Sequence, residues 1–376
     1  MELTDYRAQI DAIDNDIVRL FQERMAVAAQ IAQYKEANGL PIFQPARERE
    51  KLAQVSAMAQ EDMQSYLRVL YSLLFELSRT YQGKDRRTPL YERISAAIET
   101  TPRLFPRTAT VACQGVEGAY SQLACEKMFA NPTIQYFRSF EGVFSALEAG
   151  FCQYGILPIE NSTAGSVKRV YDLMVSHEFS IVRSTRLKVD HCLLAKPNSG
   201  ELHEIFSHEQ AIRQCAGFLK TLGNVKVTAL ENTAAAAKAV AESDRTDVAA
   251  LSSRLCAELY GLRVVKSSVQ DEGNNHTRFL CISKQTEIYP GADRTTLMLI
   301  LPHKPGALYK ILARLYALGI NLLKLESRPI PDRDFEFLFY LDLETSVYSE
   351  EFVRLMCEIG DVCEEFKYLG SYSEVV

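Results

Sequence analysis

Apolar residues recur at helical spacing through the start of this chain, and this repeat constrains the fold more than any other feature. The pattern is sustained for about nine turns without a proline. It predicts one long helix that ends at Asn38-Gly39-Leu40-Pro41, because a glycine followed by a proline is typical of a helix terminus. The apolar positions are Leu3, Tyr6, Ile10, Ile13, Ile17, Leu20, Phe21, Met25, Ala28 and Ile31.

Two shorter helices are predicted next, from about Pro45 to Ala59 and from about Met63 to Gln82. Gly83 would close an all-helical domain over residues 1–83. Two short helices cannot bury the whole apolar stripe of a much longer one. We therefore expect two copies of the chain to intertwine, as a homodimer or a higher homo-oligomer.

The pattern changes twice after the helical domain. Residues 84–107 hold prolines near their ends and are predicted to be a linker. Strand-like and helical runs then alternate over residues 108–287, which is typical of an α/β domain whose helices cover parallel strands. The run His191 to Ala195 is expected to cross between two lobes, and the run from Thr277 to return to the first.

Residues 293–376 follow a third pattern. Strand and helix signals succeed one another in the order βαββαβ, which predicts an α+β domain of the ferredoxin-like type. The predicted elements are Thr295–Leu301, Gly306–Leu318, Asn321–Ser327, Phe335–Leu343, Ser349–Ile359 and Glu365–Leu369.

Composition excludes several classes of function. At 376 residues, two or three domains are expected. A net charge of −6 argues against a nucleic-acid binder. No run approaches the roughly 18 apolar residues of a membrane span, and the acidic start lacks a leader, so we expect a cytoplasmic protein. Nine cysteines without a C-x-x-C pair are predicted to be reduced core residues, and six histidines without ligand spacing predict no metal.

Cations are spaced along the predicted N-terminal helices so that some share a face. Arg24 and Lys35 lie 11 residues apart, which brings them onto one face of the first helix, whereas Arg7 points elsewhere and would enter a partner subunit's site. Ser78 and Gln82 share a face of the third helix. Gathering cations inside a bundle costs desolvation energy unless a dianionic ligand neutralises them. The alternative is a solvated helix face with scattered charges.

These residues, together with Arg47-Glu48, resemble the all-helical chorismate mutase family over essentially the whole of residues 1–83. The resemblance implies that Arg7, Arg24 and Arg47 hold the substrate's carboxylates. It further implies that Lys35 and Gln82 donate to the ether oxygen and that Glu48 binds the hydroxyl, with Ser78 at the substrate. Gln44 stands where some relatives place an acid, and this departure puts that contact in doubt.

The triplet Thr277-Arg278-Phe279 places a hydroxyl, a guanidinium and a ring together at a strand entrance. A substrate that loses a hydroxyl group while its carboxylate is held needs a weak proton donor, a fixed cation and an apolar wall. Two strand-to-helix turns elsewhere present backbone N–H groups to an anion, although ordinary capping explains them as well. The accompanying segments are Gln114–Ser121, Leu157–Ser162, Asp190–Leu194 and Ser207–Gln210.

In combination, these segments resemble the prephenate dehydratase family across residues 108–285. The resemblance implies a two-lobed domain similar to periplasmic binding proteins, with its site in the cleft. It implies that Thr277 assists departure of the ring hydroxyl and that Phe279 lines the pocket. Prephenate would be bound by Arg278, Ser121 and the segment Glu160, Asn161 and Ser162. His191 and His208 are interpreted as structural, and no cofactor is expected.

Two late motifs lie in the ferredoxin-like region. Gly306-Ala307-Leu308 opens a helix whose unpaired amides could meet a carboxylate, and Glu326-Ser327-Arg328 ends a strand. A plain loop and edge strand would explain them without context. In context they resemble the phenylalanine-binding motifs of the ACT regulatory domain, which implies feedback by phenylalanine.

The whole chain thus resembles the bifunctional chorismate mutase/prephenate dehydratases of phenylalanine biosynthesis, with the substrates chorismate and prephenate. Two alternatives stay open. The chain could be a regulator that senses metabolites without turnover. It could also be a dehydratase that keeps its helical domain only for dimerisation, for which Gln44 is the sole hint.

Overall fold

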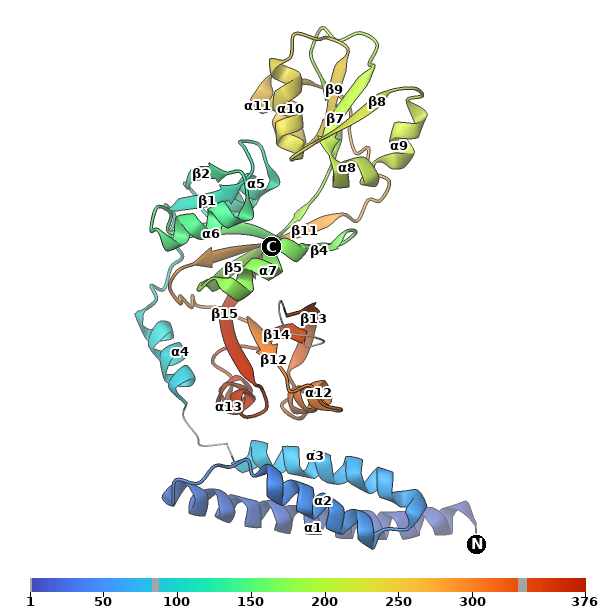
Figure 1. Cartoon of the computed structure of the whole chain (residues 1–376), viewed down its shortest axis with the longest axis vertical. Helices are drawn as coiled ribbons and strands as arrows, with labels where there is room; N and C mark the ends of the chain where they lie inside the picture. Colours follow the sequence, from blue (N-terminus) through green and yellow to red (C-terminus); the bar gives the residue numbers. More distant parts are fainter. Residues whose placement is uncertain (1, 83–87, 331–336) are drawn as a thin grey trace. The chain divides into compact units, whose positions relative to one another are not determined.

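A computed structural model describes residues 2–82, 88–330 and 337–376 (Figure 1). The chain divides into two compact units. The first consists of Met1–Ala96 and Thr295–Tyr368, and the second of Ala97–Arg294 and Leu369–Val376.

The N-terminal part of the first unit is helical among the described residues (Figure 1). The prediction of one long first helix is confirmed, because α1 spans Leu3–Ala37. Asn38 caps its C-terminus and is followed by Gly39, whose φ of +64° is the left-handed conformation that glycine adopts without strain. Helices α2 (Pro45–Met58) and α3 (Gln64–Gln82) pack against each other, and α3 also packs against α1. The predicted boundary at Gly83 lies outside the described residues.

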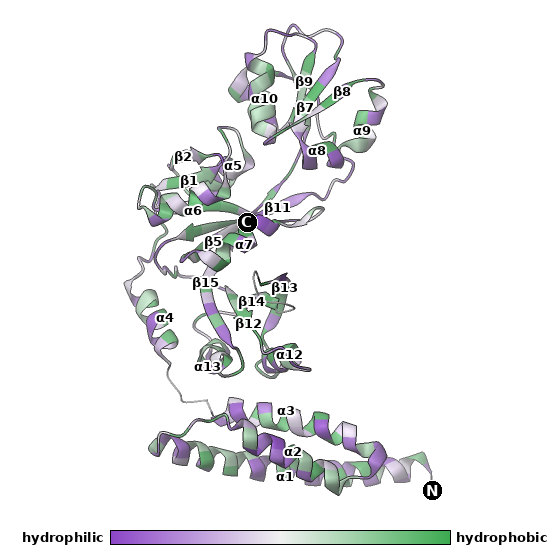
Figure 2. Cartoon of the chain, in the orientation of Figure 1, coloured by the Kyte–Doolittle hydropathy of each residue, from purple (hydrophilic) through white to green (hydrophobic). Residues whose placement is uncertain are grey.

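Most of the apolar stripe of α1 is uncovered in a single copy. Ile10, Ile13 and Ile17 are 57%, 58% and 57% exposed, whereas Ala28 is buried. Figure 2 shows hydrophobic and hydrophilic residues alternating along this helix. α1 thus presents far more apolar surface than two short helices can cover.

The rest of the first unit has the predicted βαββαβ order. Its sheet is ordered β13-β14-β12-β15, with β13 and β14 antiparallel. The start of the predicted third strand, residues 335–336, lies outside the described residues. The elements are β12 (Arg294–Ile300), α12 (Ala307–Ala317), β13 (Asn321–Pro329), β14 (Phe337–Glu344), α13 (Glu350–Glu358) and β15 (Glu365–Val375).

The second unit contains two sheets, one in each lobe. The first lobe is ordered β5-β11-β3-β1-β2, and the end of β15 adds to it beside β5. Strands β1, β2 and β3 are parallel, as the sequence predicted, whereas β11 is antiparallel to both of its neighbours. The strands are β1 (Thr110–Gln114), β2 (Thr133–Phe137), β3 (Tyr154–Asn161), β4 (Gly165–Ser166), β5 (Ser180–Lys188) and β11 (His276–Ser283).

Helices of the first lobe follow these strands in the alternating order that the sequence predicted. They are α5 (Tyr120–Met128), α6 (Phe140–Glu148) and α7 (Lys168–Ser176). Helix α4 (Pro89–Thr100) occupies the segment predicted as a linker, of which residues 84–87 lie outside the described part of the chain.

The second lobe has a sheet ordered β10-β6-β9-β7-β8. The chain passes between the lobes just before β6, and β11 returns to the first sheet as predicted. The elements are β6 (Cys192–Ala195), β7 (Glu204–His208), α8 (Glu209–Gln214), α9 (Ala216–Thr221), β8 (Lys226–Leu230), α10 (Thr233–Glu242), β9 (Val248–Ser252), α11 (Arg254–Tyr260) and β10 (Arg263–Lys266).

Strand β15 is longer than predicted because its last residues join the sheet of the first lobe. Ser373–Val375 pair in parallel with β5. Gly370 lies so close to β5 that a Cβ atom there would collide with the backbone of Ile181. A glycine is therefore required at this crossing.

Eight of the nine cysteines are buried, in agreement with their predicted place in the core. None of the described helices combines the length and the apolar character needed to cross a bilayer.

Candidate active sites

A cavity of about 380 Å³ in the second unit is lined by Thr277 and Phe279 of β11, Asn161 of β3 and Ser121 of α5. Thr277 is half-buried, whereas Phe279, Asn161 and Ser121 are buried. Because successive residues of a strand face opposite sides of a sheet, Thr277 and Phe279 share one face of β11. Four of the residues predicted from the sequence thus meet in one cavity.

Asn161 is the best-connected polar side chain at this cavity. Its Oδ1 accepts hydrogen bonds from the backbone N–H groups of Thr163 (3.1 Å) and Ala164 (2.9 Å). A backbone N–H can only donate, so these contacts fix which end of the amide is oxygen. The amide nitrogen therefore faces the other way, toward Asn275 Oδ1 (2.7 Å), the carbonyl oxygen of His276 (3.2 Å) and Thr277 Oγ1 (2.9 Å).

The hydroxyl of Thr277 is oriented by this arrangement. Asn161 Nδ2 donates to Thr277 Oγ1, so the hydroxyl oxygen acts as an acceptor on that side. A hydroxyl has one proton to donate, and because Thr277 lines the cavity this proton can be offered to a group bound there. The geometry suits a weak acid that assists a leaving group.

Arg278 lies on the opposite face of β11. Its guanidinium pairs with Glu160 at 3.1 Å and donates to the hydroxyl of Tyr372 at 3.2 Å, and the side chain is only 5% exposed. Arg278, Glu160 and Ser162 line a different cavity, together with Glu374. The structure therefore does not bring these three predicted residues into the cavity of Thr277, because the two-residue period of the strand turns Arg278 away.

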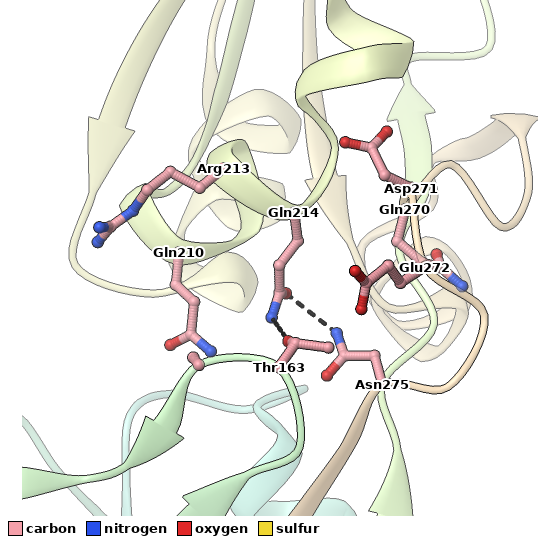
Figure 3. A pocket seen from close by; sticks show the side chains of 9 residues that line it. Thr163, Gln210, Arg213, Gln214, Gln270, Asp271, Glu272 and Asn275 are labelled. Carbon is pink, nitrogen blue, oxygen red and sulfur yellow. Dashed lines mark hydrogen bonds between the residues drawn. The ribbon is translucent and has the colours of Figure 1, made fainter.

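Gln214, at the end of α8, was missed by the sequence analysis. Its amide nitrogen donates to Thr163 Oγ1 (2.7 Å) and its oxygen accepts from Asn275 Nδ2 (3.1 Å), as the dashed lines in Figure 3 show. It lines the cavity of Thr277 and an adjoining one of about 500 Å³. The available signal was its position one turn after Gln210 on the same helix.

The two histidines of the earlier motifs line the same cavity. His191 is 2% exposed, and burial lowers its pKa, which keeps the ring neutral near pH 7. His208 caps α8, since its Nδ1 accepts from the backbone N–H of Gln210, and burial lowers its pKa as well. Neither ring therefore brings a positive charge to the cavity.

A second cluster lies between α1 and α3 of the first unit. Arg24 donates to the hydroxyl of Ser78, which is 6% exposed. Burial lowers the pKa of Arg24 and also that of Lys35, where the charge of Glu48 acts in the opposite direction. Lys35 Nζ donates to the carbonyl oxygen of Ile42 at 2.7 Å. The predicted cations are thus held partly out of water.

Glu48 of α2 pairs with Arg79 of α3, a residue that the sequence analysis did not single out. Gln82, one turn after Ser78, lines a neighbouring cavity of about 350 Å³, and its buried side-chain oxygen has no hydrogen-bond partner among the residues that the structure describes. The cavity is lined by Ala29, Ala32, Gln33, Glu36, Leu40, Pro41, Ile42, Tyr81 and Gln82.

Three predicted residues of the helical domain are not part of this cluster. Arg47 is exposed and pairs with Glu50, and Gln44 is exposed at the N-cap of α2. Arg7 is exposed and precedes Arg24 by 17 residues, which is about 26 Å along one helix. Arg7 and Arg24 of one copy therefore cannot contact the same small ligand.

The late motifs lie at the two places that the sequence predicted. Gly306, with φ of +82°, precedes the first residues of α12, Ala307 and Leu308. Glu326, Ser327 and Arg328 lie near the end of β13 and pair with β14. No cluster of three or more potential metal ligands occurs among the described residues.

Comparisons with known proteins give matches to parts of both units. The family model for prephenate dehydratase matches residues 111–287, and that for chorismate mutase type II matches residues 6–83. The chain is 30% identical to the bifunctional chorismate mutase/prephenate dehydratase of Escherichia coli K12 over 97% of this chain and 95% of that protein. It is 30% identical to the protein of that description in Aquifex aeolicus, over 100% and 99% of the two chains.

A solved structure of prephenate dehydratase from Arthrobacter aurescens, in complex with L-Phe, is also similar. It is 26% identical with a TM-score of 0.65, and the match covers 70% of this chain and 90% of that one.

Proposed function

Because the chain belongs to the family of bifunctional chorismate mutase/prephenate dehydratases, we propose that its two side-chain clusters carry the two reactions separately. The protein is an enzyme of phenylalanine biosynthesis that rearranges chorismate to prephenate and then converts prephenate to phenylpyruvate, with loss of carbon dioxide and water. One observation carries the assignment of the dehydratase site. Thr277, with its hydroxyl oriented by Asn161, lines a cavity within residues that match the dehydratase family.

In the mutase site, Arg24 would hold a carboxylate while Lys35 and Gln82 donate to the ether oxygen. The rearrangement has no chemical nucleophile, so catalysis depends on folding the substrate and stabilising charge on the departing oxygen. Glu48 would accept a hydrogen bond from the substrate's hydroxyl, and Ser78 would fix Arg24, to which it is hydrogen-bonded.

In the dehydratase site, Thr277 would donate its proton to the departing ring hydroxyl as carbon dioxide leaves. Ser121 would bind a carboxylate and Phe279 would provide the apolar wall. Arg278 would take a different part from the one expected. Its bonds to Glu160 and Tyr372 suit it to hold β11 in place behind the cavity.

We infer that the chain forms a homodimer whose interface includes α1. The exposed isoleucines of this helix support an interface with a second copy, as does the 17-residue separation of Arg7 from Arg24. In such a dimer Arg7 would complete the mutase site of the partner subunit, and Arg47 would turn toward the substrate from its present pair with Glu50.

The C-terminal βαββαβ region would be an ACT domain that binds phenylalanine and inhibits the dehydratase. The order of its elements supports this proposal, and so does the complex of a similar dehydratase with L-Phe. Coupling must be reciprocal, so prephenate would weaken phenylalanine binding by the factor by which phenylalanine weakens prephenate binding.

Replacing Gly306 with alanine should weaken phenylalanine binding several-fold. A side chain at its φ of +82° costs about 1 kcal/mol or more, so the backbone should shift and misalign the amide groups at the start of α12 that would meet the carboxylate. Isothermal titration calorimetry measures the change. Gly319→Ala is the matched control, since Gly319 follows the other end of α12, has φ of +67° and is equally uncrowded. Equal phenylalanine affinity in the parent and Gly306→Ala would remove this motif from the proposed sensor.

Replacing Gln82 with glutamate should make mutase activity rise as the pH falls. An amide donates at any pH, whereas a carboxyl group donates to the ether oxygen only when protonated, and an ordinary glutamate has a pKa of about 4.3. Initial rates of chorismate loss between pH 4.5 and 8 measure the effect. Gln60→Glu, at an exposed position, is the control. A flat profile for Gln82→Glu would remove Gln82 from the site.

The division of labour is tested directly by supplying the purified protein with chorismate and following prephenate and phenylpyruvate together, with and without phenylalanine. We expect both products in sequence, with the second suppressed by phenylalanine. Binding of these metabolites without turnover would instead support the alternative that the chain is a metabolite-sensing regulator.

A further inference from the structure

Arg79 is a deeply buried cation beside the mutase cluster. It follows Ser78 on α3 and is 5% exposed. Its guanidinium forms ion pairs with Glu48 of α2 and with Glu76 one turn earlier on α3. The guanidinium also lies over the ring of Phe43, 4.9 Å from the ring centroid. A long side chain is thus fixed on three sides.

Glu76, the second partner of Arg79, is itself immobilised. It is 3% exposed, accepts a hydrogen bond from Arg314 of α12 at 3.2 Å, and lies 3.4 Å from Lys310 of the same helix. Arg314 in turn donates to the carbonyl oxygen of Glu358 at 2.9 Å. Burying a carboxylate is costly unless cations surround it, and here three do.

The charge state of Arg79 is secure. Burial lowers the pKa of its guanidinium, but the carboxylates of Glu76 and Glu48 outweigh this effect and raise the pKa above its ordinary value. Arg79 therefore remains a cation at every working pH and keeps its hold on Glu48.

Glu48 differs from Glu76 in that 22% of its side chain is exposed. Arg79 contacts one of its oxygens, Oε1. A carboxylate offers about four acceptor sites, so the group keeps capacity to accept a hydrogen bond from a ligand. Without Arg79 the same carboxylate would be free to rotate away or to pair with Lys35.

We propose that Arg79 is a positioning residue of the mutase, whose guanidinium holds the Glu48 carboxylate in the orientation in which it accepts the substrate hydroxyl. The proposal rests on the role proposed above for Glu48. It assigns Arg79 no contact with the substrate. Glu76 and Arg314 serve to hold the guanidinium in place.

The test is steady-state chorismate mutase kinetics on the full chain with Arg79→Met, Arg79→Lys, Glu48→Gln and the double variant Arg79→Met/Glu48→Gln. A contact present in both ground and transition states affects KM, whereas partial unfolding lowers the apparent kcat at unchanged KM. If Arg79→Met weakens the hydrogen bond between the Glu48 carboxylate and the substrate, KM should rise about tenfold or more, because hydrogen bonds to charged groups contribute that much binding energy. We expect kcat to change by less than about twofold. Arg79→Lys should recover part of the loss, because an ammonium can still pair with Glu48.

The double variant shows whether Arg79 acts through Glu48. We expect Arg79→Met to have no further effect on KM once Glu48 is glutamine. Arg68→Met is the control, since Arg68 lies on the same helix and also donates to a buried side chain, the hydroxyl of Ser56, although Arg68 itself is exposed. Far-UV circular dichroism and prephenate dehydratase activity verify that each variant is folded.

Two results would overturn the inference while leaving the role of Glu48 intact. The first is a parental KM in Arg79→Met. The second is an equal increase in KM when Arg79→Met is introduced into the parent and into Glu48→Gln, which would indicate that Arg79 contacts the substrate directly or has a purely structural role. Parental kinetics in Glu48→Gln would instead refute the proposed role of Glu48 and, with it, the inference.

Discussion

Thr277→Ala is expected to abolish phenylpyruvate formation while chorismate is still converted to prephenate at the parental rate. In the proposed site Thr277 would be the oriented proton donor to the leaving hydroxyl, because Asn161 Nδ2 already donates to Thr277 Oγ1 and the threonine proton can then face the substrate. Proton transfer by a positioned side chain typically raises the reaction rate about 10²- to 10⁴-fold, and the decrease in kcat should fall in this range.

Two further substitutions separate the hydroxyl from its orientation. Thr277→Ser keeps the donor and should retain much of the activity, whereas Thr277→Val, which has the same shape, should be as inactive as alanine. Asn161→Asp keeps an acceptor for the backbone N–H groups of Thr163 and Ala164 but has no N–H to give Thr277. Its carboxylate would accept a hydrogen bond from the threonine hydroxyl instead, which turns that proton away from the substrate. Dehydration should therefore fall although the loop is still held.

Measurement requires prephenate supplied directly, so that the mutase does not limit the rate. Thr228→Ala is a matched control, since Thr228 hydrogen-bonds Glu204 in the sheet of the second lobe. If Thr277→Ala dehydrates prephenate at the parental rate, another group protonates the leaving hydroxyl, and neutral His191 would be the first to examine.

The sequence predicted those parts of the fold that depend on local pattern. The length of α1 follows from an apolar repeat and a Gly39 terminus, and the βαββαβ order follows from alternating runs. The antiparallel course of β11 and the extension of β15 to Val375 could not be predicted, because both depend on pairing with β5, which is remote in the sequence.

The candidate site was predicted less completely, for two different reasons. The position of Arg278 behind the cavity could have been predicted from the sequence, since adjacent residues of a strand face opposite sides of the sheet. The contacts of Gln214 with Asn161 and Asn275, and of Arg79 with Glu48, join residues 31 to 61 positions apart. Such contacts are visible only once the helices and loops are placed in space.

Aspartates placed on the apolar stripe of α1, as in Ile10→Asp/Ile17→Asp, are expected to produce monomers that have lost mutase activity and keep dehydratase activity. Burying one isoleucine is worth about 1.5–3 kcal/mol, and a carboxylate in its place adds desolvation cost, so two substitutions should shift dimerisation by several orders of magnitude. Analytical ultracentrifugation measures the assembly, and product assays measure both activities.

The control adds two negative charges to the opposite face of the same helix. Asn15 and Gln22 are exposed and lie about 200° around the helix from the neighbouring stripe residues Ile13 and Leu20. Asn15→Asp/Gln22→Asp should remain dimeric and active. A monomer of Ile10→Asp/Ile17→Asp that keeps full mutase activity would show that the site is complete in one copy.

Mixing two inactive variants tests the shared site without disturbing the interface. Arg7→Ala and Arg24→Ala should each be inactive as homodimers, since every site in them lacks one cation. In a heterodimer, one site receives Arg24 from the first chain and Arg7 from the second and is complete, whereas the other site lacks both. Random exchange makes about half of the dimers mixed, so about a quarter of the sites should recover. If both arginines served the same copy's site, no mixture would regain activity, and the 17 residues between them on α1 would need another explanation.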